Sequence, residues 1–182
     1  MAGALEDRVY ADGVEPTIIE DFIKIKPING YFNIPVRSGI KRGSDPLNII
    51  LHEIPYKPGL LPSTVRNVWE TGNIQFIGHF IIGTDGTIIN AVPDDEFCFH
   101  TEVKPNIKNN YKIHDYNIDS ISIFLICDSP DGNLSEKELE SLQSLLRHLT
   151  SKWNISNVIT TYDATGVAEP RFFIEKRNEI TY

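Results

Sequence analysis

The pattern of hydrophobic and polar positions changes character near residue 47 of this chain. Residues 1–46 are rich in proline, glycine and charge, with one ordered-looking stretch in which Asn29-Gly30 favour a short β-hairpin. From residue 47 onward the pattern becomes regular. We therefore expect an N-terminal extension or docking arm over 1–46, packed on the domain or on a partner, and one domain over 47–182.

Five stretches after this boundary have the length and composition of β-strands. They are residues 47–53, 76–82, 87–92, 119–128 and 156–163. The second and third flank Gly83-Thr84-Asp85-Gly86, whose residue types favour the turn of a hairpin. The fourth alternates and then becomes continuously apolar, which indicates a central strand. The polar, aperiodic residues 101–119 predict a loop.

Two further stretches have helical character. The first, LPSTVRNVWETG, has Ser63 or Thr64 near its expected cap and Gly72 at its expected end. Ahead of the second, Ser135 and Glu138 form a capping-box pattern, and leucines then recur at helical spacing. The order β-α-β-β-loop-β-α-β predicts an α/β fold: a mixed central β-sheet flanked by helices, with an irregular N-terminal extension.

Composition and charge narrow the classes of function. Hydrophobic residues make up 41% of the 182-residue chain and charged residues 23%, which is typical of a globular domain. Seventeen basic and twenty-five acidic side chains give a net charge of -8, the wrong sign for a protein that binds nucleic acid by neutralising phosphates. Cys98 and Cys127 lie in separate apolar stretches and are expected to be buried free thiols.

The chain also lacks the patterns of export and membrane insertion. Its first residues show no basic segment followed by an apolar core, and no stretch approaches the length of a membrane-spanning helix. We therefore expect synthesis in the cytoplasm without a signal peptide, and no membrane partner.

Five phrases occur in a fixed order between residues 47 and 173. They are IILHE, HFIIGTDGTIINAVPDDEFCFHT, DSISIFLI, SEKELESLQSLLRHLTSKWNIS and VITTYDATGVAEPRFF. Together they resemble the zinc N-acetylmuramoyl-L-alanine amidases, whose fold is shared by phage amidase lysozymes and peptidoglycan recognition proteins. The resemblance implies a zinc ion, held by two histidines and a third ligand, that polarises the muramoyl-L-alanine amide and activates a water. His52 matches the first of these histidines.

At four other positions the chain departs from what the resemblance implies. Thr161 stands where the second histidine is expected, and Glu169, before Pro170, takes the place of the third ligand. Val167 falls near a lysine that supports the tetrahedral intermediate, and Gly78 replaces a tyrosine used by some members. Neither replacement has a side chain that can donate a hydrogen bond. These changes predict a catalytically degenerate site that binds no zinc.

A rebuilt metal site remains an alternative. We expect His79 and His100 to face the same pocket as His52, and histidines with Glu169 or Asp163 are a reasonable ligand set for a divalent metal. Glu169 and Asp163 are also the candidate catalytic carboxylates. In the simpler interpretation, His52 is a hydrogen-bonded histidine at a strand end, and Glu169 is a surface or capping carboxylate.

The predicted binding positions extend beyond these groups. Tyr162, Phe99 and Trp69 are expected either to wall a groove for glycan or peptide or to pack in the core or at its rim. The full set of predicted binding residues is His52, His79, His100, Thr161, Tyr162 and Glu169.

Three functions agree with this pattern. A degenerate amidase-like domain would bind peptidoglycan without cleaving it, or would serve as a structural or interaction protein, for example in a phage particle, docked through residues 1–46 onto other subunits. An active cell-wall lysin with an atypical metal site is the alternative. The replaced positions favour degeneracy, and leave wall binding and particle architecture both open.

Overall fold

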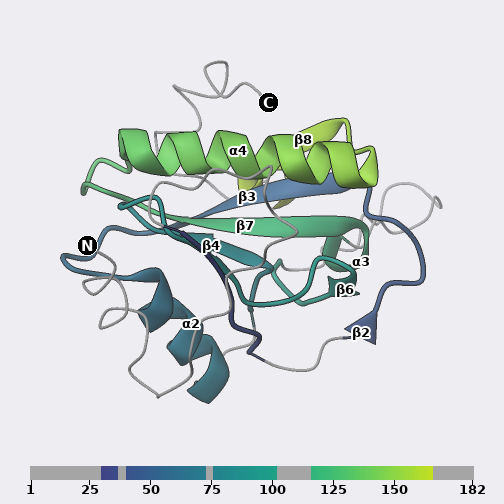
Figure 1. Cartoon of the computed structure of the whole chain (residues 1–182), viewed down its shortest axis with the longest axis horizontal. Coiled ribbons are helices and arrows are strands. Elements are labelled where there is room, and N and C mark those ends of the chain that lie inside the picture. The colour runs from purple at the N-terminus through teal and green to yellow at the C-terminus, as the bar shows by residue number, and fades with distance from the viewer. Residues whose placement is uncertain (1–29, 37–39, 73–75, 102–115, 166–182) are drawn as a thin grey trace.

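A mixed six-stranded β-sheet forms the centre of the structure (Figure 1), a computed structural model that describes residues 30–36, 40–72, 76–101 and 116–165. In sheet order its strands are β1 (Tyr31–Asn33), β5 (Ile88–Asn90), β4 (Phe80–Ile82), β7 (Ser120–Ile126), β3 (Asn48–Ile54) and β8 (Asn157–Thr160). β4 and β5 pair antiparallel, and the other neighbours pair parallel. The predicted mixed sheet is confirmed, and β7 has the central place expected of it.

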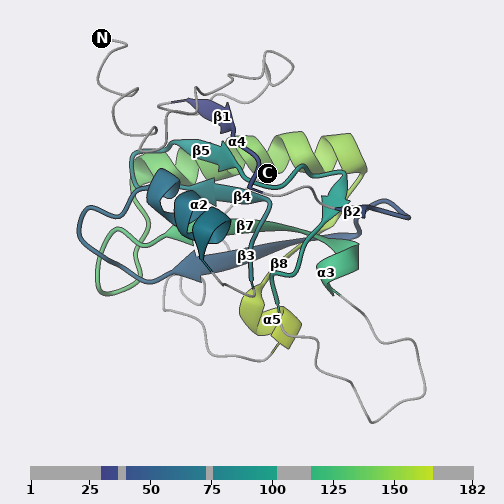
Figure 2. The same cartoon turned by 90° about the horizontal axis from the view of Figure 1, so that it is seen from below.

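Two helices cover opposite faces of this sheet (Figures 1 and 2). They are α4 (Glu136–Trp153) and α2 (Pro62–Thr71). The leucines predicted to form one stripe of α4 pack into an apolar cluster with alternate residues of the central strands. The cluster on the other face contains Trp69 of α2 and, at its border, Phe124 of β7.

The predicted turn between β4 and β5 is present. The Gly86 N–H donates to the Gly83 carbonyl at 2.8 Å, and the Asp85 carboxylate accepts from the Thr87 N–H at 2.9 Å. Gly86 has a φ of 83°, a conformation that glycine adopts without a steric cost. This hairpin fixes the position of β4, and so of His79 immediately before it.

The two helix starts differ in their agreement with prediction. Ser135 caps α4, and its hydroxyl accepts from the Glu138 N–H at 3.0 Å. Ser63 and Thr64 lie in the first turn of α2, near its cap as expected, but the cap itself is Leu61, whose side chain makes no capping bond. Proline in the first turn starts α2 instead, since its fixed φ suits a helix and its missing N–H is not needed there. Gly72 ends α2 as predicted.

Part of the predicted extension belongs to the sheet. β1 pairs parallel with β5, and Phe32, Ile34 and Val36 are buried in the cluster under α2. Any hairpin partner that precedes Gly30 lies outside the described residues. For residues 1–29 the predicted docking arm stays a prediction.

Three short elements complete the described chain. β2 (Ile40–Lys41) and β6 (Glu96–Phe97) form a separate antiparallel pair. Within the predicted loop, the described end forms α3 (Tyr116–Asp119), while residues 102–115 lie outside the description. The last predicted strand is shorter than expected, because α5 (Thr161–Thr165) begins directly after β8. No helix in the described ranges is long and apolar enough to cross a membrane.

Candidate functional site

Three buried histidines meet where β3, β4 and β6 approach one another. His52 lies near the end of β3, His79 precedes β4, and His100 follows β6. The His52 Nε2 atom lies 2.9 Å from the His100 Nδ1 atom, and the ring centroids of His79 and His100 are 6.2 Å apart. The structure therefore brings together the three histidines that the sequence placed at one pocket.

The hydrogen bonds of His100 and His52 indicate which nitrogen carries each proton. His100 Nε2 lies 3.2 Å from the Tyr116 carbonyl, which can only accept, so we infer that this nitrogen is protonated. In a neutral ring His100 Nδ1 is then an acceptor, and the His52 Nε2–H donates to it. His52 Nδ1 is left as an acceptor, 2.9 Å from the Thr161 hydroxyl. The result is one directed chain, from Thr161 through His52 and His100 to Tyr116.

His79 is held in a separate set of bonds. Its Nδ1 atom accepts from the Ser122 N–H at 3.0 Å, and its Nε2 atom lies 2.9 Å from the Glu96 carbonyl. The Ser122 N–H makes Nδ1 an acceptor, so a neutral ring carries its proton on Nε2, which then donates to the Glu96 carbonyl and cannot accept from Arg42. The Arg42 guanidinium lies 2.9 Å from the same Nε2 atom and donates to the Ser120 carbonyl at 2.6 Å. Arg42 thus holds a positive charge against His79.

Burial keeps all three histidines neutral. It lowers the pKa values of His52 and His79 well below the ordinary value, and it lowers the pKa of His100 to about 3. The neighbouring His100 lowers the pKa of His52 further, and the Arg42 charge does the same for His79. Neutral imidazoles are therefore the species whose hydrogen bonds the structure shows.

The space over Gly78 is filled by an aromatic ring. A Cβ atom on Gly78 would overlap the ring of Phe124 and come within 3.1 Å of the Ser122 hydroxyl. The same ring stacks on His52, with centroids 4.4 Å apart and an interplanar angle of 11°. Trp69 meets it edge-on at 5.1 Å. No side chain at position 78, tyrosine included, fits this arrangement.

The other predicted residues lie outside the histidine cluster, in a helix cap, in the core or at the surface. The Asp163 carboxylate accepts from the Thr160 N–H at 2.9 Å and from its hydroxyl at 3.1 Å, as a local cap of α5. Trp69 is buried in the core. Tyr162 and Phe99 are 55% and 56% exposed, so both remain available at the surface.

Two predicted positions, Val167 and Glu169, lie outside the described residues. The metal-ligand role and the catalytic role of Glu169 therefore both stay predictions.

The described residues do not fit a zinc shell. Both ring nitrogens of His52 are hydrogen-bonded, one to Thr161 and the other to His100. Within residues 30–36, 40–72, 76–101 and 116–165, no group of three His, Cys, Asp or Glu side chains is placed to hold a metal ion. Thr161, at the position where the resemblance led us to expect a zinc-binding histidine, bonds His52 through its hydroxyl.

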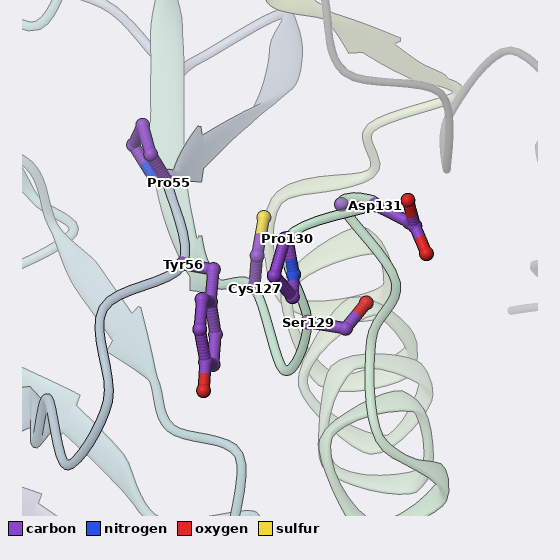
Figure 3. Close-up of a pocket in the computed structure, with 7 residues that line it drawn as sticks. Pro55, Tyr56, Cys127, Ser129, Pro130 and Asp131 are labelled. Carbon is purple, nitrogen blue, oxygen red and sulfur yellow. The ribbon is translucent and has the colours of Figure 1, made fainter.

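A cavity of about 340 Å³ lies elsewhere, at the ends of β3 and β7 (Figure 3). It is lined by Pro55, Tyr56, Cys127, Ser129, Pro130, Asp131 and Gly132, none of them a predicted site residue. In Figure 3 the side chains of Ser129 and Asp131 point away from Tyr56. Burial and the Glu53 carboxylate raise the pKa of the Cys127 thiol to about 12, so the thiol is protonated. The polar groups do not converge as they do in a ligand site.

The mixed sheet, with helices on both faces and histidines gathered at strand ends, defines an amidase-like α/β domain. Residues 42–169 match the family model of N-acetylmuramoyl-L-alanine amidase, and the chain belongs to this family. No curated protein matches the chain in sequence.

Solved structures of low sequence identity share the fold. The endolysin amidase LysCS from Clostridium intestinale URNW has a TM-score of 0.60 at 17% identity, covering 85% of this chain and 98% of LysCS. A mutant endolysin from Bacillus subtilis has a TM-score of 0.63 at 21% identity, covering 83% and 96%. The complex of peptidoglycan recognition proteins LCa and LCx with tracheal cytotoxin gives 0.55 at 16% identity, covering 79% and 89%.

Sequence reasoning missed three residues that shape the site. Phe124 was included in a central strand, but the face to which it points could not be assigned. Arg42 was placed in the extension, yet its guanidinium also donates to the carbonyls of Asp94 and Ile118. Ser122 holds His79 through its N–H and hydroxyl. The alternation of Ser120, Ser122 and Phe124 along the strand was the available signal that one face is polar.

Proposed function

We propose that this chain binds peptidoglycan without cleaving the muramoyl-L-alanine bond by a zinc mechanism. The observation on which this rests is the double engagement of His52, whose two ring nitrogens bond Thr161 and His100. A metal at His52 would have to displace one of these bonds and would find a hydroxyl where the family has its second histidine. Losing one of three protein ligands removes a usual requirement of catalytic zinc.

Peptidoglycan is the proposed ligand because of the family and the surface near the histidines. The solved relative bound to tracheal cytotoxin is named a peptidoglycan recognition protein. In this chain Phe99 precedes His100 and Tyr162 follows Thr161, and both aromatic rings are more than half exposed. Aromatic side chains bury large areas at interfaces, and the tyrosine hydroxyl adds a hydrogen-bonding group.

A sacculus-binding assay tests this proposal. Purified protein should sediment with intact sacculi, release no muropeptides and contain less than stoichiometric zinc. Tyr162→Ala and Phe99→Ala should each weaken sedimentation. Tyr56→Ala is the matched control, since Tyr56 is 40% exposed but lines the separate cavity. Stoichiometric zinc together with muropeptide release that His52→Ala abolishes would establish the active lysin instead.

We further propose that the domain acts within a larger assembly, such as a phage particle, or at the host cell wall. Residues 1–29 are the proposed docking arm. A truncation should begin at Gly30, because β1 and the buried Phe32, Ile34 and Val36 belong to the domain. If this truncated chain co-sediments with its assembly as well as the full chain does, the arm has no docking role.

A further inference from the structure

We infer that Thr161, His52 and His100 form a metal-free nucleophilic site that can accept an acyl group on the Thr161 hydroxyl. A hydroxyl nucleophile needs a base within about 2.6–3.2 Å, and the base needs a third group that orients it. The hydroxyl lies 2.9 Å from His52 Nδ1, and His52 Nε2 lies 2.9 Å from His100 Nδ1. Both distances meet the requirement in the same chain of residues.

The direction of the bonds is the one that such a site requires. The Tyr116 carbonyl fixes the proton on His100 Nε2, which makes His52 protonated at Nε2 and leaves the Nδ1 lone pair facing Thr161. A base must present a lone pair, not an N–H, to the hydroxyl that it activates. The same chain would be useless for this purpose if it ran in the opposite direction.

Thr161, the proposed nucleophile, is less buried than the two histidines that support it. Thr161 is partly exposed at the start of α5, whereas His52 and His100 are buried. Phe124 stacks on His52 and so fixes the plane of its ring. Thr161 is thus the partly exposed member of the chain, and the imidazole pair lies buried behind it.

The reaction balances without a metal or a redox partner. The Thr161 oxygen attacks the carbonyl carbon of an acyl ester, and its proton passes to His52 Nδ1. The tetrahedral adduct collapses, the ester C–O bond breaks, and the imidazolium returns the proton to the departing alkoxide. Water then attacks the acyl-threonine, again with His52 as base, and releases the carboxylic acid.

Three features limit the substrate to activated acyl esters. Burial and the neighbouring His100 lower the pKa of His52 well below its ordinary value, so His52 is a weak base. The third member is a neutral imidazole, which stabilises a neighbouring imidazolium less than a carboxylate does. The Leu51 carbonyl, 3.1 Å from the Thr161 hydroxyl, also competes for its proton. We therefore expect slow turnover, with the acyl-threonine accumulating rather than being hydrolysed as fast as it forms.

Acetylation by p-nitrophenyl acetate tests the inference. The wild-type chain should gain one acetyl group that peptide mapping places on Thr161. Thr161→Val should lose this adduct and Thr161→Ser should keep it. Thr165→Val is the matched control and should keep it as well, because the Thr165 hydroxyl bonds a backbone carbonyl of the same helix. His52→Gln should slow acetylation by about 10²–10⁴-fold.

An adduct that is absent, or that persists in folded Thr161→Val, overturns the inference. The unfolding transition of each variant shows whether it is folded. A smaller fall in rate for His100→Asn, with its acetyl group still on Thr161, would support an orienting role for His100. Sacculus binding by Thr161→Val is measured separately, so that loss of the acyl site and loss of wall binding are distinguishable.

Discussion

The two faces of the central sheet are built from the same strands but contain different chemistry. On β7 the side chains under α4 are Ile121, Ile123 and Leu125, and those on the α2 side include Ser120, Ser122 and Phe124. The first face is stabilised mainly by apolar burial. The second face buries imidazoles and hydroxyls, and each must find a hydrogen-bond partner. The comparison shows that the α2 side carries a buried polar layer in which the three histidines are hydrogen-bonded, while the α4 side is mostly apolar.

Acid should destabilise the histidine face first, and this is the largest effect we expect. The folded pKa values of His52, His79 and His100 are lowered, so this part of the stability is present above about pH 6.5 and is lost as pH falls. Each histidine should contribute a slope of up to about 1.4 kcal/mol per pH unit below that value. Urea unfolding from pH 7.5 to pH 5 measures the slope. A flat profile would show that the imidazoles are not buried neutral.

Truncating a buried leucine on the α4 side should lower the free energy of unfolding by nearly as much as acid does. This loss should not depend on pH. Leu145 is fully buried, so Leu145→Ala should lower the free energy of unfolding by about 2–5 kcal/mol. Val68 of α2 is 44% exposed, and Val68→Ala should change stability by less than about 0.5 kcal/mol. Urea unfolding at pH 7.5 compares the two variants. Equal losses would mean that the cluster under α4 is not the main core.

The Glu138 carboxyl is buried on the α4 side of the sheet. It should change the stability with pH by a smaller amount than the histidines and in the opposite direction. Burial raises the pKa of Glu138 to about 9, so the folded state keeps a proton that the unfolded chain loses above about pH 4.5. The stability associated with this proton is complete below pH 4.5 and decreases up to about pH 9. Glu138→Gln should therefore stabilise the protein at pH 8 by on the order of 1–3 kcal/mol and change little at pH 4.5. Thermal unfolding at both pH values measures this difference, and a stabilisation that is the same at both would contradict it.

The smallest expected effect concerns the hydroxyl that ends the histidine chain. Thr161→Val should cost about 1–2 kcal/mol, because His52 Nδ1 loses its donor while the side-chain shape is kept. Thr165→Val removes a bond to a helix carbonyl and should cost about half as much or less. Urea unfolding at pH 7.5 ranks the pair, and a reversed ranking would mean that Thr161 is not an important donor to His52.

Local patterns predicted most of the fold, because they depend on neighbours in the chain. Alternation, turn residues and helical leucine spacing placed the central strands, the β4–β5 hairpin and α4. The exact start of α2 was missed because Pro62 dictates it through backbone geometry and no side-chain cap is needed. A strand after Gly30 was expected in a hairpin, but the pairing of β1 with β5 was not predicted because β5 is distant in sequence.

The residues that form the site could be predicted from the sequence, but the hydrogen bonds between them could not. His52, His79 and His100 were expected together because the resemblance to the amidase fold implies one pocket for them. The direction of their hydrogen bonds depends on the Tyr116 carbonyl, which no pattern of residue types reveals. The resemblance drew attention to Thr161, but its bond to His52 needed the positions of α5 and β3.

The contact between Gly78 and Phe124 also restricts how this lineage can change. Restoring a side chain at position 78 alone would force it into the Phe124 ring. Removing that ring alone would take away the surface on which His52 stacks and would open a void beside Trp69. Each single step is harmful although the two together would be compatible. A larger residue at position 78 is therefore compatible with this packing only together with a change at position 124.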